Sequence, residues 1–221
     1  MNVNNPLAVC RRAPPVAGDK PIVFVVDDDI SVRESLELLI SFAQWQPQLF
    51  ESAKDFLSQP RPVVPSCLVL DINLPDLNGL DLQTAIASER PDMPIIFITG
   101  YGDIPRTVRA MKAGAVEFLT KPFDDDVLLN AIAGALEGSR RALDRENNLR
   151  FLRTAYTSLT PREHEVMAMV VAGRLNKLIA ADLNISEITV KAHRGKVMRK
   201  MKARSLADLV KMAALLMLPI G

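Results

Sequence analysis

The feature that most constrains the fold is a regular alternation between residues 21 and 137, where short apolar runs rich in β-branched residues alternate with longer helical segments. Such alternation is typical of a parallel sheet wrapped by helices. We therefore expect an α/β domain of the flavodoxin-like (βα)5 type. The expected strands are 22–26, 47–50, 67–71, 94–98 and 116–119, and the expected helices are 30–43, 53–58, 78–89, 104–113 and 124–138.

Three further parts complete the chain. Residues 1–20 are a polar tail without the apolar core of a signal peptide, and we expect this tail to be disordered. Residues 138–156 are charged and lack proline, which favours a helical linker, with a flexible linker as the alternative. Residues 157–221 show no strand pattern, which indicates a separate all-α domain of four helices. These expected helices are 161–172, 176–183, 186–201 and 205–217.

The two domains carry opposite charge. Residues 21–136 hold 8 Lys and Arg against 17 Asp and Glu, a net charge of −9, whereas residues 156–221 hold 11 against 5, a net charge of +6. This asymmetry predicts a cationic partner for the first domain and a polyanion for the second. The apolar runs are too short to span a bilayer, and the two cysteines have no metal-ligand spacing. We therefore expect a cytoplasmic protein with no membrane partner.

Polar side chains follow four of the expected strands. Asp27 and Asp28 follow the first, and Asp71, Thr99 and Lys121 stand at the ends of three others. Ligands of open α/β sheets bind beyond these carboxyl ends. Carboxylate oxygens suit a hard cation such as Mg²⁺ or Mn²⁺, while Lys121 and Thr99 can bind phosphoryl oxygens. Asp71 is then available as a nucleophile toward phosphorus.

These residues resemble the receiver domain of two-component response regulators. The matching stretches are VVDDD, LVLDINLPDLNG, FITGYGD and MKAGAVEFLTKPF, which cover about residues 21–140. The resemblance implies that Asp71 is the phosphoacceptor and that a sensor histidine kinase supplies the phosphoryl group. It also implies metal ligation by Asp27, Asp28, Asp71 and the backbone carbonyl of Asn73.

The same resemblance implies a set of switch residues. Thr99 corresponds to the switch hydroxyl, Phe118 to the switch aromatic, and Lys121 to the phosphate-binding lysine, which precedes a cis peptide at Pro122. Phe118 is equally compatible with an ordinary core role. Tyr101 stands where relatives often have histidine or a small residue, and we include it with the switch residues.

A metal-dependent phosphatase is the enzymatic alternative, because such enzymes also use a strand-end aspartate beside Mg²⁺. They place a second acid two residues after the nucleophile to protonate the leaving group. Here that position is Asn73. We therefore expect no enzymatic activity apart from self-phosphorylation and slow autodephosphorylation of the receiver aspartate.

The stretch NKLIAADLNISEITVKAHRGKVMRKM indicates a helix-turn-helix. Its first helix is expected to bury Leu178, Ile179 and Leu183, and Ser186 is the expected N-cap of the second helix. In that second helix Val190, Val197 and Met201 recur at helical spacing and form a buried stripe. The basic residues outside this stripe are Lys191, Arg194, Lys196, Arg199 and Lys200.

The segment from Leu159 to Ala213 is similar to the LuxR-type DNA-binding domain, and the whole chain after Pro21 to the FixJ-type members of the NarL/LuxR-like response regulators. The resemblance implies a double-stranded DNA operator as partner. It places Lys191, Ala192 and Gly195 at base edges, with Gly195 either favoured by close DNA approach or simply tolerated. The full candidate set is Asn176, Lys177, Thr189, Lys191, Ala192, His193, Arg194, Gly195, Lys196 and Arg199.

The two domains suggest a common mechanism. Phosphorylation of Asp71 would pair two receiver domains, and a homodimer would bind a palindromic operator more tightly than a monomer. The final helix, 205–217, is apolar on more than one face: one face is expected to cover the core, and the surplus suits a dimer contact, with a role in the core alone as the alternative. Two alternatives stay open: a DNA binder that phosphorylation does not control, and a phosphotransfer or protein-interaction module.

Overall fold

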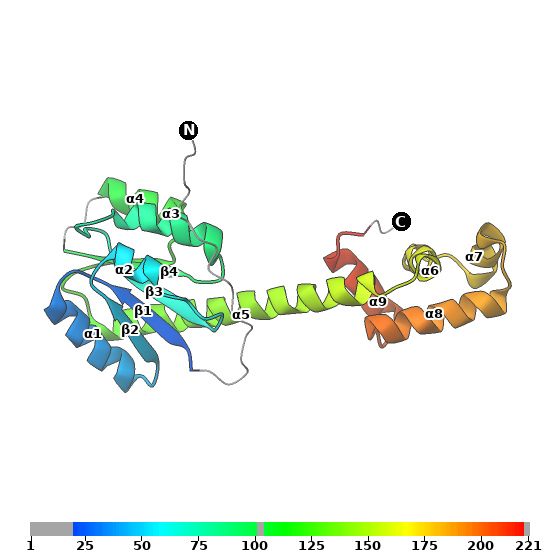
Figure 1. The fold of residues 1–221 in the computed structure, drawn as a ribbon, viewed down its shortest axis with the longest axis horizontal. Helices are drawn as coiled ribbons and strands as arrows, with labels where there is room; N and C mark the ends of the chain where they lie inside the picture. The colour runs from blue at the N-terminus through cyan, green and yellow to red at the C-terminus, as the bar shows by residue number, and fades with distance from the viewer. Residues whose placement is uncertain (1–19, 101–103, 219–221) are drawn as a thin grey trace. The chain divides into compact units, whose positions relative to one another are not determined.

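The computed structural model describes residues 20–100 and 104–218 (Figure 1). The described residues form two compact units, which are divided in the chain between Leu143 and Asp144. Within these residues no helix is both long enough and apolar enough to cross a membrane.

The first unit is built on a parallel sheet with the strand order β2-β1-β3-β4-β5. Helices alternate with the strands along the chain, which confirms the predicted flavodoxin-like fold. The strands are β1 (Ile22–Val26), β2 (Gln46–Phe50), β3 (Ser66–Asp71), β4 (Ile95–Thr99) and β5 (Glu117–Thr120). The helices are α1 (Ile30–Phe42), α2 (Ala53–Ser58), α3 (Gly79–Glu89), α4 (Ile104–Lys112) and α5 (Asp125–Thr157).

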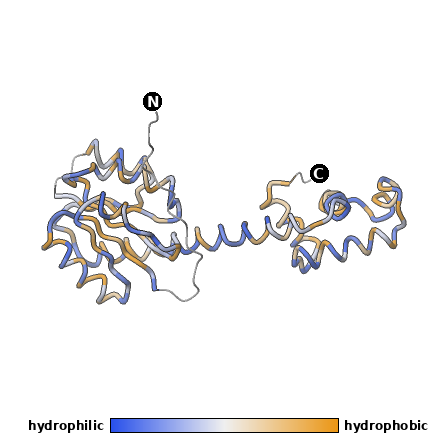
Figure 2. The backbone as a smooth tube through the Cα atoms, in the orientation of Figure 1, coloured by the Kyte–Doolittle hydropathy of each residue, from blue (hydrophilic) through white to orange (hydrophobic). Residues whose placement is uncertain are grey.

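The sheet has a core on each face. Phe24 and Val26 of β1 point into a cluster with side chains of α2, α3 and α4, whereas Val23 and Val25 point into a cluster with side chains of α1 and α5. A strand covered on both faces needs apolar residues at every position, and β1 is hydrophobic along its length in Figure 2. This explains why its sequence is a continuous apolar run that ends abruptly at Asp27.

The helix α5 passes through the whole of the predicted linker. It runs without a break from Asp125 to Thr157, so residues 138–156 are helical. Ser139 is buried in the first unit, where its hydroxyl accepts a hydrogen bond of 3.1 Å from the backbone N–H of Ser66. Leu152 and Ala155 are buried in the core of the second unit. The two ends of this helix therefore contribute to two separate cores.

The second unit contains four further helices, as the sequence predicts. They are α6 (Pro161–Val171), α7 (Asn176–Leu183), α8 (Glu187–Met201) and α9 (Leu206–Leu215). Asn184 ends α7 in the left-handed conformation, with φ of 53° and ψ of 49°, and Ser186 caps α8 by accepting from the N–H of Thr189. These caps form the turn of the helix-turn-helix.

One sequence prediction in α7 is wrong. Leu178 was expected on the buried face, but 53% of its surface is exposed. Ile179 and Ala180 are buried, and Leu183 is packed partly against the same core. Successive residues of a helix are separated by about 100°, which places Leu178 about 140° away from Leu183. A single face cannot bury both leucines.

Candidate functional sites

The carboxyl edge of the sheet gathers the polar residues that the sequence singles out. The registers of β1, β3, β4 and β5 bring Asp27, Asp71, Thr99 and Lys121 to the same edge. The strand order changes direction between β1 and β3, and ligands of such sheets bind beside this position. Asp27 and Asp71 follow or end these two strands.

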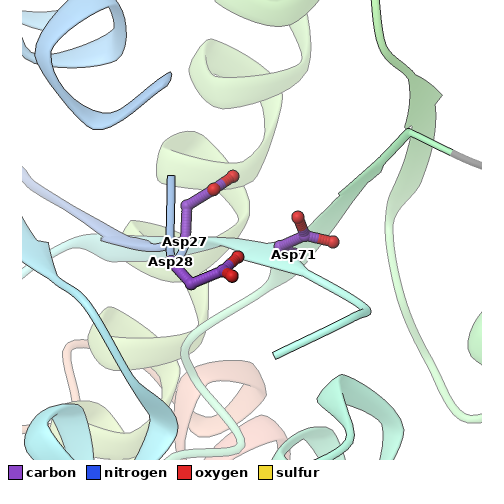
Figure 3. Close-up of side chains that lie close together, drawn as sticks. All are labelled: Asp27, Asp28 and Asp71. Carbon is purple, nitrogen blue, oxygen red and sulfur yellow. The ribbon is translucent and has the colours of Figure 1, made fainter. Parts of the chain in front are cut away.

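Three carboxylates lie together at this edge (Figure 3). Asp27, Asp28 and Asp71 each offer an oxygen, and these oxygens all lie within 4.8 Å of one another. Asp27 and Asp71 are buried, whereas Asp28 is exposed. One cation can therefore contact all three side chains and remain accessible from the side of Asp28.

Lys121 supplies the positive charge that this cluster requires. Its Nζ lies 2.6 Å from Oδ2 of Asp27 and 3.0 Å from Oδ2 of Asp71. Burial alone lowers the pKa of Lys121, but its hydrogen bonds and ion pairs with the two aspartates outweigh burial and raise that pKa above its usual value. The pKa of Asp27 is raised chiefly by burial, against the opposing effect of Lys121.

Asp29 has a structural role beside the cluster. It is the N-cap of α1, and its Oδ1 accepts a hydrogen bond of 2.9 Å from the N–H of Ser31. Arg33, in the first turns of the same helix, donates from Nη1 to the backbone carbonyl of Asp27 at 2.6 Å. This contact could not be predicted from the sequence, because it depends on where α1 begins.

The loop after β3 orients Asp71. The N–H of Asn73 donates to Oδ1 of Asp71 at 3.0 Å, and Nδ2 of Asn73 lies 3.4 Å from Oγ1 of Thr99. Gly79 lies against the same loop: a Cβ there would be 2.8 Å from the carbonyl oxygen of Asp71 and 3.0 Å from Cα of Ile72. Only glycine permits this close approach, a role that its place in the motif did not reveal.

The remaining switch candidates differ in position. Phe118 is half-buried and packs against the core cluster of the α2–α4 face, so it is both a packing residue and partly accessible. The peptide between Lys121 and Pro122 is cis. Tyr101 lies outside the described residues.

The second site is the outer surface of α8. Val190, Val197 and Met201 are buried, as predicted, so the opposite face of the helix points away from the core. The exposed candidates are Lys177, Lys191, Ala192, Gly195, Lys196 and Arg199, and the half-buried ones are Asn176, Thr189, His193 and Arg194. The exposed group combines cations with two very small residues.

Two of the half-buried candidates, Arg194 and Thr189, make hydrogen bonds within the helix-turn-helix. Nη1 of Arg194 donates to Oδ1 of Asn176 at 3.2 Å, which links α8 to α7. The hydroxyl oxygens of Thr189 and Ser186 lie 2.8 Å apart at the start of α8. Nδ1 of His193 is buried and has no hydrogen-bond partner among the described residues.

The far end of α8 is fixed by a contact that the sequence analysis missed. Nζ of Lys200 donates to Oε2 of the buried Glu163 at 2.6 Å. Glu163 also accepts from the N–H of Thr160 in a capping box at the start of α6. The bond to Lys200, followed by that to Thr160, lowers the pKa of Glu163 to about 2. The pattern Thr160-Pro-Arg-Glu163 is a recognisable capping signal, but the bond to Lys200 is not local.

Two family models match separate parts of the chain. Residues 23–133 match the response regulator receiver domain, and residues 157–213 match the bacterial regulatory proteins of the luxR family. The first match contains the carboxylate cluster, and the second contains α6, α7 and α8.

Several known proteins are similar over most of their length. The Nodulation protein W of Bradyrhizobium diazoefficiens is 51% identical over 89% of this chain and 87% of its own length. The Transcriptional regulatory protein FixJ of Rhizobium meliloti is 42% identical over 86% of this chain and 94% of its own. Among solved structures, the response regulator StyR is 46% identical with a TM-score of 0.80, covering 89% of this chain and 99% of StyR. Full-length FixJ from B. japonicum is 38% identical with a TM-score of 0.53, covering 90% and 98%.

Proposed function

The chain belongs to the FixJ-type response regulators, in which a receiver domain is joined to a LuxR-type DNA-binding domain, and we propose that phosphorylation of Asp71 controls its binding to DNA. Both domains are those of regulators rather than of catalytic enzymes. The receiver domain implies a kinase as partner, and the second domain implies DNA. We infer that the kinase is a sensor histidine kinase and that the protein acts in the cytoplasm.

The observation that carries this proposal is the placement of Lys121 between Asp27 and Asp71. Its ammonium group lies within 3.0 Å of both carboxylates, so a cation is held beside the oxygen that would receive the phosphoryl group. An aspartate with a purely structural role at a strand end needs no such partner. The nearby carboxylates of Asp27 and Asp28 would only repel its charge and lower the stability of the fold. The arrangement is suited to binding a dianion next to Asp71.

The carboxylate cluster also fits a divalent cation, which we infer to be Mg²⁺ or Mn²⁺. The three carboxylates that approach within 4.8 Å, together with the backbone carbonyl of Asn73, are the groups that would hold it. Such oxygen ligands are those that Mg²⁺ prefers, and Mg²⁺ also binds phosphate oxygens. When bound, the cation would neutralise charge on the phosphoryl oxygens and the acidic side chains.

In the proposed reaction Asp71 is the nucleophile. A carboxylate oxygen of Asp71 attacks the phosphorus of a phosphohistidine, a P–O bond forms, and the P–N bond breaks. The imidazole of the kinase leaves and regains its proton from water. Lys121 would then bind a phosphoryl oxygen as a point charge, and Asn73, whose N–H holds Oδ1 of Asp71, would keep the carboxylate oriented.

We further infer that the phosphoryl group shifts the residues beside it. Thr99 ends the neighbouring strand β4 and can donate its hydroxyl to a phosphoryl oxygen. The loop after Thr99 leads to α4, and the half-buried Phe118 on β5 packs close to α4 in the same core cluster. A shift in this region would change the surface of α4 and β5, which we propose to be the surface that forms the homodimer.

For the second domain we propose that α8 enters the major groove. Its outer face carries the cations Lys191, Lys196 and Arg199, and Lys177 adds a cation from α7. The residues at the start of such a helix approach base edges, while flanking lysines and arginines contact phosphates. A dimer would place two such helices on one palindromic operator and gain affinity by effective concentration.

The test of the phosphoacceptor is the intact mass after incubation with acetyl phosphate and Mg²⁺. The wild type should gain one phosphoryl group, and Asp71→Asn should gain none. Asp76→Asn, which alters another aspartate of the same loop region, is the matched control and should still gain the group. An adduct that persists in Asp71→Asn would contradict the assignment. If a cognate kinase also produced no adduct on the wild type, a DNA binder independent of phosphorylation would be favoured.

The test of the DNA-binding surface is Lys191→Ala. Loss of a side chain at a base edge should weaken binding to a specific duplex by about 1–3 kcal/mol, measured by fluorescence anisotropy. Lys54→Ala, which removes an exposed lysine of the receiver domain, is the control and should have no effect. Unchanged affinity in Lys191→Ala would favour a phosphotransfer or protein-interaction module instead.

A further inference from the structure

One large apolar side chain of α8 points into solvent. Ile188 is the second residue of the helix, and 80% of its surface is exposed. In this fully described helix it is the one large hydrophobic residue with an exposed side chain, because Val190, Val197 and Met201 are buried and Met198 packs partly against the same core. A lone exposed isoleucine needs no explanation by itself. Its position on the helix is what makes it informative.

Ile188 lies at the centre of the outer face of α8. At about 100° per residue, it is about 180° away from Val197 in the buried stripe. Ala192 lies within about 40° of it and Gly195 within about 20°, on the two following turns of the same face. Ile188 is also at the N-terminal end, which is the end of a recognition helix that approaches base edges.

The rest of this face is suited to a close approach by DNA. Ala192 and Gly195 are both exposed and small, and a Cβ added at Gly195 would meet no heavy atom within 4 Å. The exposed cations Lys191 and Lys196 lie on opposite sides of this strip, about 60° and 80° around the helix from Ile188. Arg199, also exposed, continues the line of the strip one turn beyond Gly195. Basic side chains beside a small, uncharged strip are complementary to phosphates on both sides of a groove. This charge complementarity identifies DNA as the occupant of the face.

We propose that Ile188 contacts the 5-methyl group of a thymine and makes the protein prefer a T·A pair at one position of each half-site. The inference rests on the proposed function of α8 as a DNA-reading helix. In the major groove the thymine methyl is the apolar group among the polar base edges, so it is the group that an exposed isoleucine can recognise. Isoleucine is also restricted at χ1 in a helix, and little rotamer freedom is lost on contact.

The experiment uses the full-length chain after incubation with acetyl phosphate and Mg²⁺. Duplexes are first selected from a random-sequence library, and the best one is made again with each thymine replaced in turn by deoxyuridine, which removes only the methyl group. Affinities are measured by anisotropy for the wild type and Ile188→Ala. Leu38→Ala, which removes an apolar residue of the receiver domain that is 75% exposed, is the matched control.

One uracil position per half-site should weaken binding of the wild type by about fourfold, the value of one buried methyl group. Ile188→Ala should bind the thymine duplex more weakly by at least that factor and should be insensitive to uracil at the same position. Leu38→Ala should behave as the wild type does. Lys191→Ala should be weaker on every duplex but should keep the sensitivity to uracil.

The outcomes separate this inference from the proposed function. If a duplex is enriched and Lys191→Ala binds it weakly, but uracil affects the wild type and Ile188→Ala equally at every position, the role of Ile188 is wrong while α8 remains the reading helix. If no sequence is enriched over non-specific binding, sequence-specific recognition fails, and the role of Ile188 fails with it.

Discussion

The acidic edge of the receiver domain and the outer face of α8 both gather charge, but they hold it in opposite ways. At the acidic edge Asp27 is fully buried and the side chain of Lys121 is 20% exposed, and the two charges pair with each other at a fixed distance of 2.6 Å. On α8 the side chains of Lys191, Lys196 and Arg199 are exposed. Charges interact strongly in a buried, low-dielectric site, whereas salt screens charges in water.

This difference separates two kinds of function. The buried cluster depends on the position of each atom and is suited to a single covalent event. The exposed face acts at longer range on a polyanion, and its effect depends on ionic strength. Changes at the acidic edge should therefore alter stability and phosphorylation, whereas loss of an exposed cation on the outer face of α8 should alter chiefly the affinity for DNA.

The largest expected effect is that of Lys121→Met. Without its partner the buried carboxylate of Asp27 keeps an uncompensated charge beside Asp71, and the free energy of unfolding of the receiver domain should fall by about 3 kcal/mol in the absence of divalent cations. Urea unfolding followed by the fluorescence of Trp45, the single tryptophan, measures this domain. Lys196→Met on α8 is the control and should change stability very little. Equal effects of the two substitutions would remove the contrast between buried and exposed lysines.

A pair of glycines gives the next effect. Gly79→Ala would place a Cβ 2.8 Å from the carbonyl oxygen of Asp71, and the resulting overpacking should lower the stability of the receiver domain by about 2 kcal/mol.

Gly195→Ala meets no atom within 4 Å and should stabilise α8 by up to about 1 kcal/mol, measured by amide hydrogen exchange. Weaker DNA binding by Gly195→Ala would show that close approach favours glycine there. A stable Gly79→Ala protein would contradict the tight packing beside Asp71.

Glu163 should make the stability of the second unit depend on acid. Its pKa in the folded protein is about 2, below the ordinary value of 4.5. The stability that its charge contributes is therefore present above about pH 4.5 and is lost as the pH falls from about 4.5 to about 2. Glu163→Gln should cost roughly 1–2 kcal/mol at neutral pH and flatten this dependence, as followed by calorimetry. Glu165→Gln, which changes an exposed carboxylate of the same helix, is the control and should leave the pH dependence of stability unchanged. If that pH dependence survives in Glu163→Gln, it arises from another group.

The smallest expected effect is that of Lys196→Ala on the salt dependence of DNA binding. Loss of one phosphate contact should reduce the slope of log affinity against log salt concentration by about one, with little change in sequence preference. Titrations of one duplex over a range of salt concentrations measure this slope. An unchanged slope would place Lys196 away from the phosphates, and a changed sequence preference would assign it to a base edge instead.

The sequence predicted the fold of the first unit well because its central strands are buried on both faces. Such strands appear as uninterrupted apolar runs, and the polar residue that ends each run marks the carboxyl edge where ligands bind. Asp27, Asp71 and Lys121 could therefore be assigned to one edge before their distances were known. The contacts of Lys121 with Asp27 and Asp71 offset the repulsion among the carboxylates at this edge.

Non-local contacts escaped prediction. The bond of Lys200 to Glu163 and that of Arg33 to the carbonyl of Asp27 join residues whose proximity depends on how helices pack or where they begin. Leu178 was placed on the wrong face because three large apolar residues in a helix of eight residues allow more than one inner face. In such a short helix the spacing of the apolar residues does not determine which face is buried.

The central step of the proposed function is the control of DNA binding by phosphorylation of Asp71. The direct test is the affinity of the full-length chain for a selected duplex, with and without acetyl phosphate and Mg²⁺, alongside light scattering and the intact mass. We expect the phosphorylated wild type to form a dimer and to bind at least about tenfold more tightly, while Asp71→Asn stays at the unphosphorylated affinity. A wild-type protein that carries the phosphoryl group, yet remains equally monomeric and binds the duplex equally well, would contradict the claim.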